Sequence, residues 1–224
     1  MVFVKSKKGY DLWADKYTGI WVESFEQNHL IEMLGNIKGK TALDAGCGAG
    51  RNIIKLVHKG AKVTGIDISP KIIFEAQQKL HKKKIDAPLF VGNLTKLQFP
   101  NETFDIIIAS SVLDHIKNLK PVFKEFERVL KKKGVLLYSG LHPNADVWLH
   151  AAQFTKNNTQ YLLEEYPHSF EEIKQLVCKN FLVQTKAIIL RLSNKQRMFY
   201  PKRIFEKERN KPVYMILKFE KKDL

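Results

Sequence analysis

Cysteine, arginine and long apolar runs are all scarce in this chain of 224 residues. Its two cysteines, Cys47 and Cys178, form neither the number nor the spacing of a disulfide framework or a metal site, so we expect free thiols and no metal. No run approaches the roughly 20 apolar residues of a membrane span, and residues 1–10 lack the apolar centre of a signal peptide. We therefore expect a cytoplasmic protein without a membrane span.

The shortage of arginine bears on the strong positive charge. The formal net charge is +15, yet 32 of the 38 basic residues are lysine and only 6 are arginine. Basic proteins attract nucleic acids, but recognition of bases and phosphates favours the arginine fork. The densest lysine runs, 82–84 and 131–133, fall where helices are expected to end, and lysine there complements the helix dipole. Nucleic acid stays an alternative partner, and we favour a solvated basic surface.

A chain of 224 residues is long enough for one α/β domain with a sizeable core, and its 44% apolar and 27% charged residues are typical of a globular protein. From residue 41 onward short apolar segments alternate with amphipathic ones, a pattern that predicts a parallel sheet covered by helices on both faces. The expected strands are 41–43, 61–66, 88–91, 104–109, 134–139, 181–191 and 213–219. The expected helices are 9–18, 27–34, 51–58, one beginning at 70, 121–130 and 171–177.

A glycine-rich turn follows the first of these strands, in the segment TALDAGCGAGRN at 41–52. Glycines at a strand-to-helix turn let the backbone approach a ligand closely, and the helix N-terminus offers unpaired N–H groups. The dinucleotide fingerprint fails here because Arg51 stands where its third glycine should be. The carboxylate of Asp44 would also repel a pyrophosphate and attract a cation. The turn therefore predicts a nucleoside ligand that carries positive charge.

A second acidic strand end supports this prediction. Asp67 follows Gly46 by 21 residues, close to the separation of about 20 at which a carboxylate meets a ribose in related βαβ sites. Ser69 and Pro70 then form a strong helix start, with serine as the cap and proline at the first helical position.

These features resemble the class I S-adenosylmethionine-dependent methyltransferases, whose first motif is D/E-x-G-x-G-x-G. The resemblance covers about residues 10–140 and is closest to the ubiquinone and menaquinone biosynthesis type. It implies a Rossmann-like three-layer sandwich, with a seven-stranded, mostly parallel sheet of order 3-2-1-4-5-7-6 and an antiparallel last strand. It also implies S-adenosylmethionine as cofactor and S-adenosylhomocysteine as product. The cofactor-binding residues that we expect are Tyr17, Asp44, Gly46, Gly48, Gly50, Asp67, Ile68, Asn93, Leu94 and Ser110.

Individual roles follow from the same resemblance. Asp67 is assigned to the ribose hydroxyls and Ile68 to one face of the adenine. Asn93 departs from the acid that the family has at this position, although its carbonyl can accept from the adenine amino group while its NH₂ donates to a ring nitrogen. His115 matches a histidine that follows the fourth strand in the family. We favour a packed histidine over a catalytic one.

The acceptor side is less defined. Tyr10, Trp13 and Tyr17 share one helix face, which either packs on the core or closes over the ligand. We divide one domain, 1–224, into a helical cap (1–36), a cofactor-binding core (41–140), a lid (141–170) and a closing helix with strands (171–224). The lid is rich in aromatic residues and has Lys156 as its only Lys or Arg, so we expect a small acceptor and a basic surplus away from the mouth of the site.

The expected chemistry is an in-line displacement that depends on alignment and exclusion of water. A base is needed only if the acceptor arrives protonated, and His142 and His168, which flank the lid, are the candidates. Two alternatives stay open: methylation of tRNA or another RNA, and a partner module that holds the cofactor without turnover. The oligomeric state cannot be read from the sequence.

Overall fold

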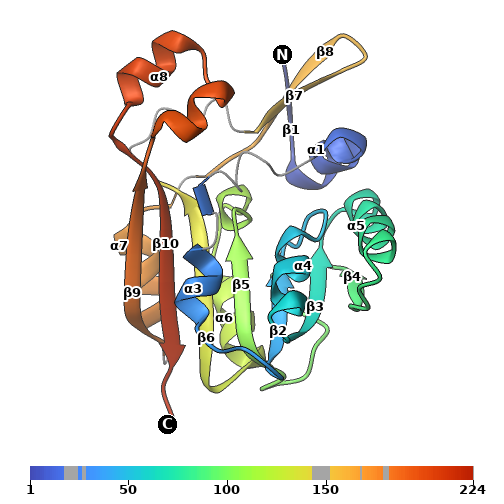
Figure 1. Cartoon of the computed structure of the whole chain (residues 1–224), viewed down its shortest axis with the longest axis vertical. Helices are drawn as coiled ribbons and strands as arrows, with labels where there is room; N and C mark the ends of the chain where they lie inside the picture. Colours follow the sequence, from blue (N-terminus) through green and yellow to red (C-terminus); the bar gives the residue numbers. More distant parts are fainter. Residues whose placement is uncertain (18–24, 27–28, 143–151, 167, 179–181, 224) are drawn as a thin grey trace.

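A seven-stranded sheet forms the centre of the computed structural model, which describes residues 1–17, 25–26, 29–142, 152–166, 168–178 and 182–223 (Figure 1). Its strands, in spatial order, are β4 (Leu89–Val91), β3 (Lys62–Asp67), β2 (Thr41–Ala45), β5 (Phe104–Ser110), β6 (Leu130–Leu141), β10 (Pro212–Lys221) and β9 (Leu182–Arg191). The first five run parallel, and β10 is antiparallel to both β6 and β9. The expected order 3-2-1-4-5-7-6 and the antiparallel last strand are confirmed.

Helices cover both faces of this sheet, so the Rossmann-like three-layer sandwich is confirmed. One face packs against α3 (His29–Leu34), α4 (Arg51–His58) and α5 (Pro70–Lys82), and the other against α6 (Lys120–Val129) and α7 (Phe170–Cys178). Successive side chains of a strand point to opposite faces, so Ile106 and Ile108 of β5 join one apolar cluster while Ile107 joins the other.

Local signals set most helix starts. The Ser69 hydroxyl accepts a hydrogen bond from the Ile72 N–H (3.1 Å), with Pro70 at the first position of α5, as expected. Ser169 caps α7 in the same way, through the Glu172 N–H at 3.1 Å. Observed boundaries of these elements differ from the expected ones by one or two residues at most ends.

A second, three-stranded sheet lies beyond the carboxyl ends of the parallel strands (Figure 1). It joins β1 (Val2–Val4) to the hairpin of β7 (Gln153–Lys156) and β8 (Thr159–Leu163), beside α1 (Ser6–Trp13) and the 3₁₀ turn η1 (Ala14–Lys16). The expected lid is thus partly a hairpin. Its two-residue loop, Asn157 and Asn158, has φ of +49° and +58°, the conformation that a tight hairpin turn requires. Trp148, one of the aromatic residues of the expected lid, lies outside the described residues.

The last two strands, β9 and β10, pair antiparallel. A 3₁₀ helix, η4 (Asn194–Phe199), and α8 (Lys202–Glu208) lie in the connection between them. Ser193 and Gln196 form a capping box at the start of η4. No helix within the described ranges is long and apolar enough to cross a membrane.

Candidate functional site

A cavity of about 440 Å³ opens at the carboxyl edge of the large sheet, between that edge and α1. Its wall includes the glycine turn after β2, the ends of β3, β4 and β5, the start of α1, and the segment after β8. Ligands of open α/β sheets bind at this edge. Eight expected cofactor residues line the cavity: Tyr17, Gly46, Gly48, Asp67, Ile68, Asn93, Leu94 and Ser110.

The glycine turn has the backbone conformation that glycine alone adopts freely. Gly46 and Gly48 have φ of +74° and +52°, and both line the cavity. A Cβ at Gly46 would overlap the side chain of Val112, and one at Gly48 would lie 3.2 Å from the Tyr17 ring. Gly50, with φ of +78°, is the cap of α4 and does not line the cavity. Any other residue in place of Gly46 or Gly48 would strain the backbone and crowd Val112 or Tyr17, which also line the cavity.

Asp67 at the end of β3 holds this turn in place. Its Oδ2 accepts the Gly48 N–H at 3.0 Å and its Oδ1 accepts the Ser69 N–H at 3.0 Å. Burial raises the pKa of the carboxyl group, while these backbone hydrogen bonds oppose the rise. Each oxygen keeps a further lone pair for a ligand hydroxyl.

Asn93, after β4, lines the cavity, and its side-chain carbonyl oxygen already accepts hydrogen bonds within the protein. Its Oδ1 accepts hydrogen bonds from the N–H and the hydroxyl of Thr95, both at 3.0 Å. We expected this carbonyl to accept a hydrogen bond from the adenine amino group, and the ligand would have to share it with Thr95. The apolar side chains of Ile68 and Leu94 line the same part of the cavity.

Asp44, at the end of β2, is 1% exposed, and neither of its oxygens accepts a hydrogen bond within the part of the chain that the structure describes. Burial raises its pKa to about 7, against the opposing effects of nearby Arg51 and the Asn52 amide. Asp44 does not itself line the cavity; it lies directly before the glycine turn that does. A buried carboxylate at this place suits a positively charged ligand group.

Sequence reasoning missed Glu26, which is fully buried behind Ser110. Its Oε1 accepts the hydroxyls of Ser110 (2.5 Å), Tyr214 (2.9 Å) and Ser139, and its Oε2 pairs with Arg51 at 2.5 Å. The Ser110 hydroxyl therefore serves an internal network as well as the cavity wall. Nothing near residue 26 in the sequence signals this role, because its partners come from four other segments.

Tyr10 and His115 meet at the other end of the cavity, and both line it. The Tyr10 hydroxyl lies 2.8 Å from His115 Nε2, and His115 Nδ1 lies 3.3 Å from the Glu164 carbonyl oxygen. A carbonyl only accepts, so Nδ1 carries the proton and Nε2 accepts from the phenol. Burial lowers the pKa of His115 and raises that of Tyr10, which keeps both groups neutral.

The helix face that carries Tyr10, Trp13 and Tyr17 both lines the cavity and packs against other aromatic residues. Tyr10 and Tyr17 line the cavity, whereas Trp13 stacks on Phe154 of β7 with ring centroids 5.0 Å apart. Phe154 in turn stacks on Tyr161 of β8 at 5.2 Å. The small sheet is thus joined to the cavity wall through a continuous row of rings.

The two histidines expected to act as bases lie elsewhere. His168 is 4% exposed, and its ring nitrogens contact the Ile116 carbonyl oxygen (2.9 Å) and the Glu172 carboxylate (3.2 Å). His142 is half-buried, and its backbone N–H donates to the Val213 carbonyl. Neither residue lines the cavity.

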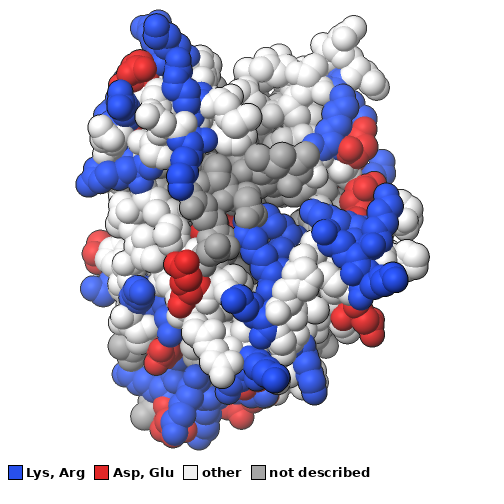
Figure 2. Space-filling view, viewed as in Figure 1, with Lys and Arg blue, Asp and Glu red and all other residues white. Residues whose placement is uncertain are grey.

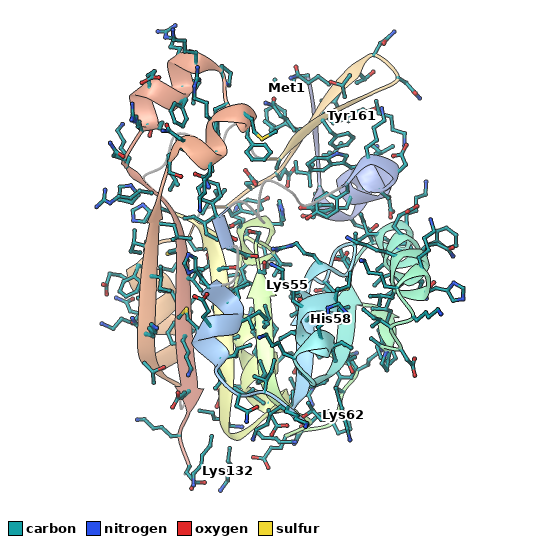
Figure 3. All side chains as sticks on the ribbon, in the orientation of Figure 1. Met1, Lys55, His58, Lys62, Lys132 and Tyr161 are labelled. Carbon is teal, nitrogen blue, oxygen red and sulfur yellow. The ribbon has the colours of Figure 1, made fainter. Side chains whose placement is uncertain are left out.

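The placement of positive charge also differs from expectation. Lysines and arginines gather over α8 and along the lower edge of the molecule (Figure 2), and Lys62 and Lys132 lie at the edge of the sheet opposite the cavity (Figure 3). However, Lys5, Lys7 and Lys117 line the cavity itself. The expectation of a mouth without a basic surplus was wrong, because these lysines come from segments outside the expected lid.

Known proteins resemble this chain in the region that builds the cavity. Residues 43–138 match the family model described as a methyltransferase domain. The ubiquinone biosynthesis O-methyltransferase of Nitrosomonas europaea is 27% identical over 153 residues, which are 67% of this chain and 63% of that protein. In this region the chain resembles S-adenosylmethionine-dependent methyltransferases.

Solved structures of this methyltransferase fold match more of the chain. The S-adenosylmethionine-dependent methyltransferase from Mesorhizobium loti has a TM-score of 0.68 at 16% identity and covers 88% of this chain and 97% of its own. The [4+2]-cyclase SpnF has a TM-score of 0.72 at 16% identity, covering 99% and 98%. These likenesses show the fold alone. In sequence, the chain spans about three fifths of the length of the first curated relatives that it matches.

The cavity fits the cofactor of this family on the observations above. Gly46 and Gly48 line the cavity with backbone at positive φ, where another residue would crowd Val112 or Tyr17, and Asp67 keeps lone pairs for hydroxyl groups. Asp44 supplies a buried carboxylate without a hydrogen bond, which suits the ammonium of S-adenosylmethionine.

Proposed function

We propose that this protein transfers a methyl group from S-adenosylmethionine to a small-molecule acceptor that binds in the same cavity. The observation that carries the proposal is that one cavity joins the glycine turn and Asp67 to Tyr10 and His115. In-line transfer requires both reactants in one enclosed space, aligned and shielded from water. The relative named as a ubiquinone biosynthesis O-methyltransferase supports a small acceptor that is methylated on oxygen.

The cofactor end is formed by the residues that the sequence suggested. Asp67 would accept the ribose hydroxyls, Ile68 and Leu94 would contact the adenine, and Asn93 would meet its polar edge. Asp44 would stabilise the ammonium group from behind the glycine turn. When bound, S-adenosylmethionine supplies an electrophilic methyl group on a sulfonium.

Tyr10 and His115 would take the proton that an acceptor hydroxyl loses as its oxygen is methylated. In this route the acceptor O–H donates to the Tyr10 oxygen while the phenol passes its own proton to His115 Nε2. The O–H bond of the acceptor breaks as its O–CH₃ bond forms, and the proton ends on the imidazole. The Glu164 carbonyl, which accepts from Nδ1, then stabilises the imidazolium. This pair replaces His142 and His168 as the base because it lines the cavity.

The aromatic residues of α1 and the small sheet would exclude water from the acceptor end. Trp13, Phe154 and Tyr161 stack in sequence beside the cavity, so the wall formed by Tyr10 is supported from behind. A dry wall strengthens every electrostatic contact with the reacting atoms.

Transfer of a radioactive methyl group tests the proposal. The purified protein is incubated with methyl-labelled S-adenosylmethionine and, separately, with the small-molecule, RNA and protein fractions of a cell extract. We expect label only in the small-molecule fraction, together with S-adenosylhomocysteine as product. Label in RNA would reject the small acceptor. Calorimetric binding of S-adenosylhomocysteine without label in any fraction would instead indicate a module that holds the cofactor without turnover.

A further inference from the structure

Three lysines line the cavity from two separate segments. Lys5 and Lys7 stand at the start of α1, and Lys117 follows the 3₁₀ turn η2 (Leu113–His115). All three side chains are exposed, and none forms an ion pair with a carboxylate of the described residues. Like charges that share one mouth repel one another unless an anion joins them.

The acids that line the same cavity do not neutralise these lysines. Asp67 lies at the cofactor end and already accepts two backbone N–H groups. Glu164 lies at the acceptor end, where its Oε2 accepts the Tyr166 hydroxyl at 2.8 Å. Among the described residues that line the cavity, three are lysines and two are acids, and both acids make other contacts.

The cofactor would increase this excess of positive charge. S-adenosylmethionine bears an ammonium, a carboxylate and a sulfonium, so it brings a net positive charge into the cavity. A cation as acceptor would be repelled by the lysines and the sulfonium together. A neutral acceptor would leave the excess in place, whereas an anion would reduce it.

We propose that the acceptor carries an oxyanion, a carboxylate or a phosphate group, which is held by Lys5, Lys7 and Lys117 while its accepting atom faces Tyr10 and His115. Lysine binds such groups as a point charge through up to three N–H donors. The anion would lie at the exposed mouth, where lysines remain hydrated, and the reacting atom would lie deeper among the aromatic rings. This inference rests on the proposed function.

Inorganic phosphate and acetate are the probes that test it. Calorimetry measures their binding to the protein saturated with S-adenosylhomocysteine, at low ionic strength, with sodium chloride of equal ionic strength as reference. The test variants are Lys7→Gln, Lys117→Gln and the double variant. The matched controls are Lys8→Gln, on the same helix, and Lys120→Gln, near Lys117; both residues are exposed and neither lines the cavity.

We expect at least one of the two anions to bind, the double variant to weaken it at least fivefold, and the controls to stay within twofold. Tighter binding of phosphate would identify a phosphate ester, and equal or tighter binding of acetate a carboxylate. Binding of neither anion, or equal weakening in Lys8→Gln and Lys120→Gln, would overturn the inference. Binding of S-adenosylhomocysteine is measured first in every variant, because its loss would count against the proposed function instead.

Discussion

The Tyr10 hydroxyl donates to His115 Nε2 across 2.8 Å, although the two residues are 105 positions apart in the chain. One belongs to α1, outside the sheet, and the other to the turn that follows β5. Their rings also meet edge to face, with centroids 5.3 Å apart. Both residues line the cavity, so the N-terminal segment forms part of its wall.

Removing either member of this pair should lower turnover without releasing the cofactor. We expect Tyr10→Phe and His115→Gln to reduce kcat by about 10²-fold or more, the range of a lost general base, with the Kd of S-adenosylhomocysteine within threefold. His142→Ala is the control, because His142 does not line the cavity. Steady-state kinetics with the labelled cofactor measure these effects. A full kcat in both pair variants would show that the acceptor needs no base.

The same pair predicts the pH profile of turnover. Burial lowers the pKa of His115 below its usual 6.5, so the imidazole is neutral and able to accept a proton at pH 7. Acidification through this lowered pKa protonates Nε2 and should reduce kcat, with a plateau on the alkaline side. The acid limb should be missing in His115→Gln. An acid limb that persists there would have to come from another group.

Asp67→Ala should weaken cofactor binding more than it weakens folding. A hydrogen bond to a charged group is worth about 1.5 to 3 kcal/mol, so the Kd should rise by one to two orders of magnitude. Asp105→Ala is the matched control, since Asp105 accepts from Thr41 at the far end of the sheet and does not line the cavity. Calorimetry and thermal unfolding of both variants separate the two effects. Similar losses of affinity in Asp67→Ala and Asp105→Ala would show that Asp67 does not bind the cofactor.

Asn93 offers a test of how the adenine is recognised. In Asn93→Asp one carboxylate oxygen can keep the Thr95 hydrogen bonds while the other accepts from the adenine amino group, so affinity should stay or rise. Asn93→Leu removes both the Thr95 hydrogen bonds and the contact with the adenine amino group, so it should weaken binding. Thr95→Val controls for the loop, because it loses only the hydroxyl contact. Equal affinity of the Leu and Asp variants would mean that other groups bind the adenine edge.

The parts of the site that lie at strand ends could be predicted because their signals are local. Gly46 and Gly48 stand directly after an apolar strand, and Asp67 directly after the next one. The Ser69 and Pro70 helix start likewise lies within four residues of the groups it affects. Such signals fix both the order of the elements and the edge at which ligands bind.

The remaining parts depend on contacts between distant segments. Val2–Val4 pairs with residues 161–163. A strand of three residues is too short for a sequence pattern that would predict its partner strand. Lys5 and Lys7 reach the cavity only through that pairing and the helix that follows it. The β7–β8 hairpin is different, because Asn157 and Asn158 between two alternating segments are a turn signal that sequence reading could have used.

Asp44 should make the stability of the cofactor-free protein depend on pH. Its pKa of about 7 in the folded protein lies above the usual 3.8, so the folded state binds an extra proton between about pH 4 and 7. Stability of the cofactor-free protein should therefore fall as the pH rises through this range, by up to about 4 kcal/mol. Asp44→Asn removes this dependence and should raise the melting temperature at pH 8.

Binding of S-adenosylmethionine should show the opposite trend, because its ammonium favours the ionised carboxylate. Affinity should increase about tenfold between pH 6 and pH 8, as a proton with a pKa near 7 is released. In Asp44→Asn the affinity should be lower and should lose this pH dependence, while Asp67→Asn should lower affinity but retain it. Calorimetry in two buffers with different ionisation enthalpies measures the released proton directly. A wild-type affinity that is flat across this range would show that Asp44 does not sense the cofactor's charge.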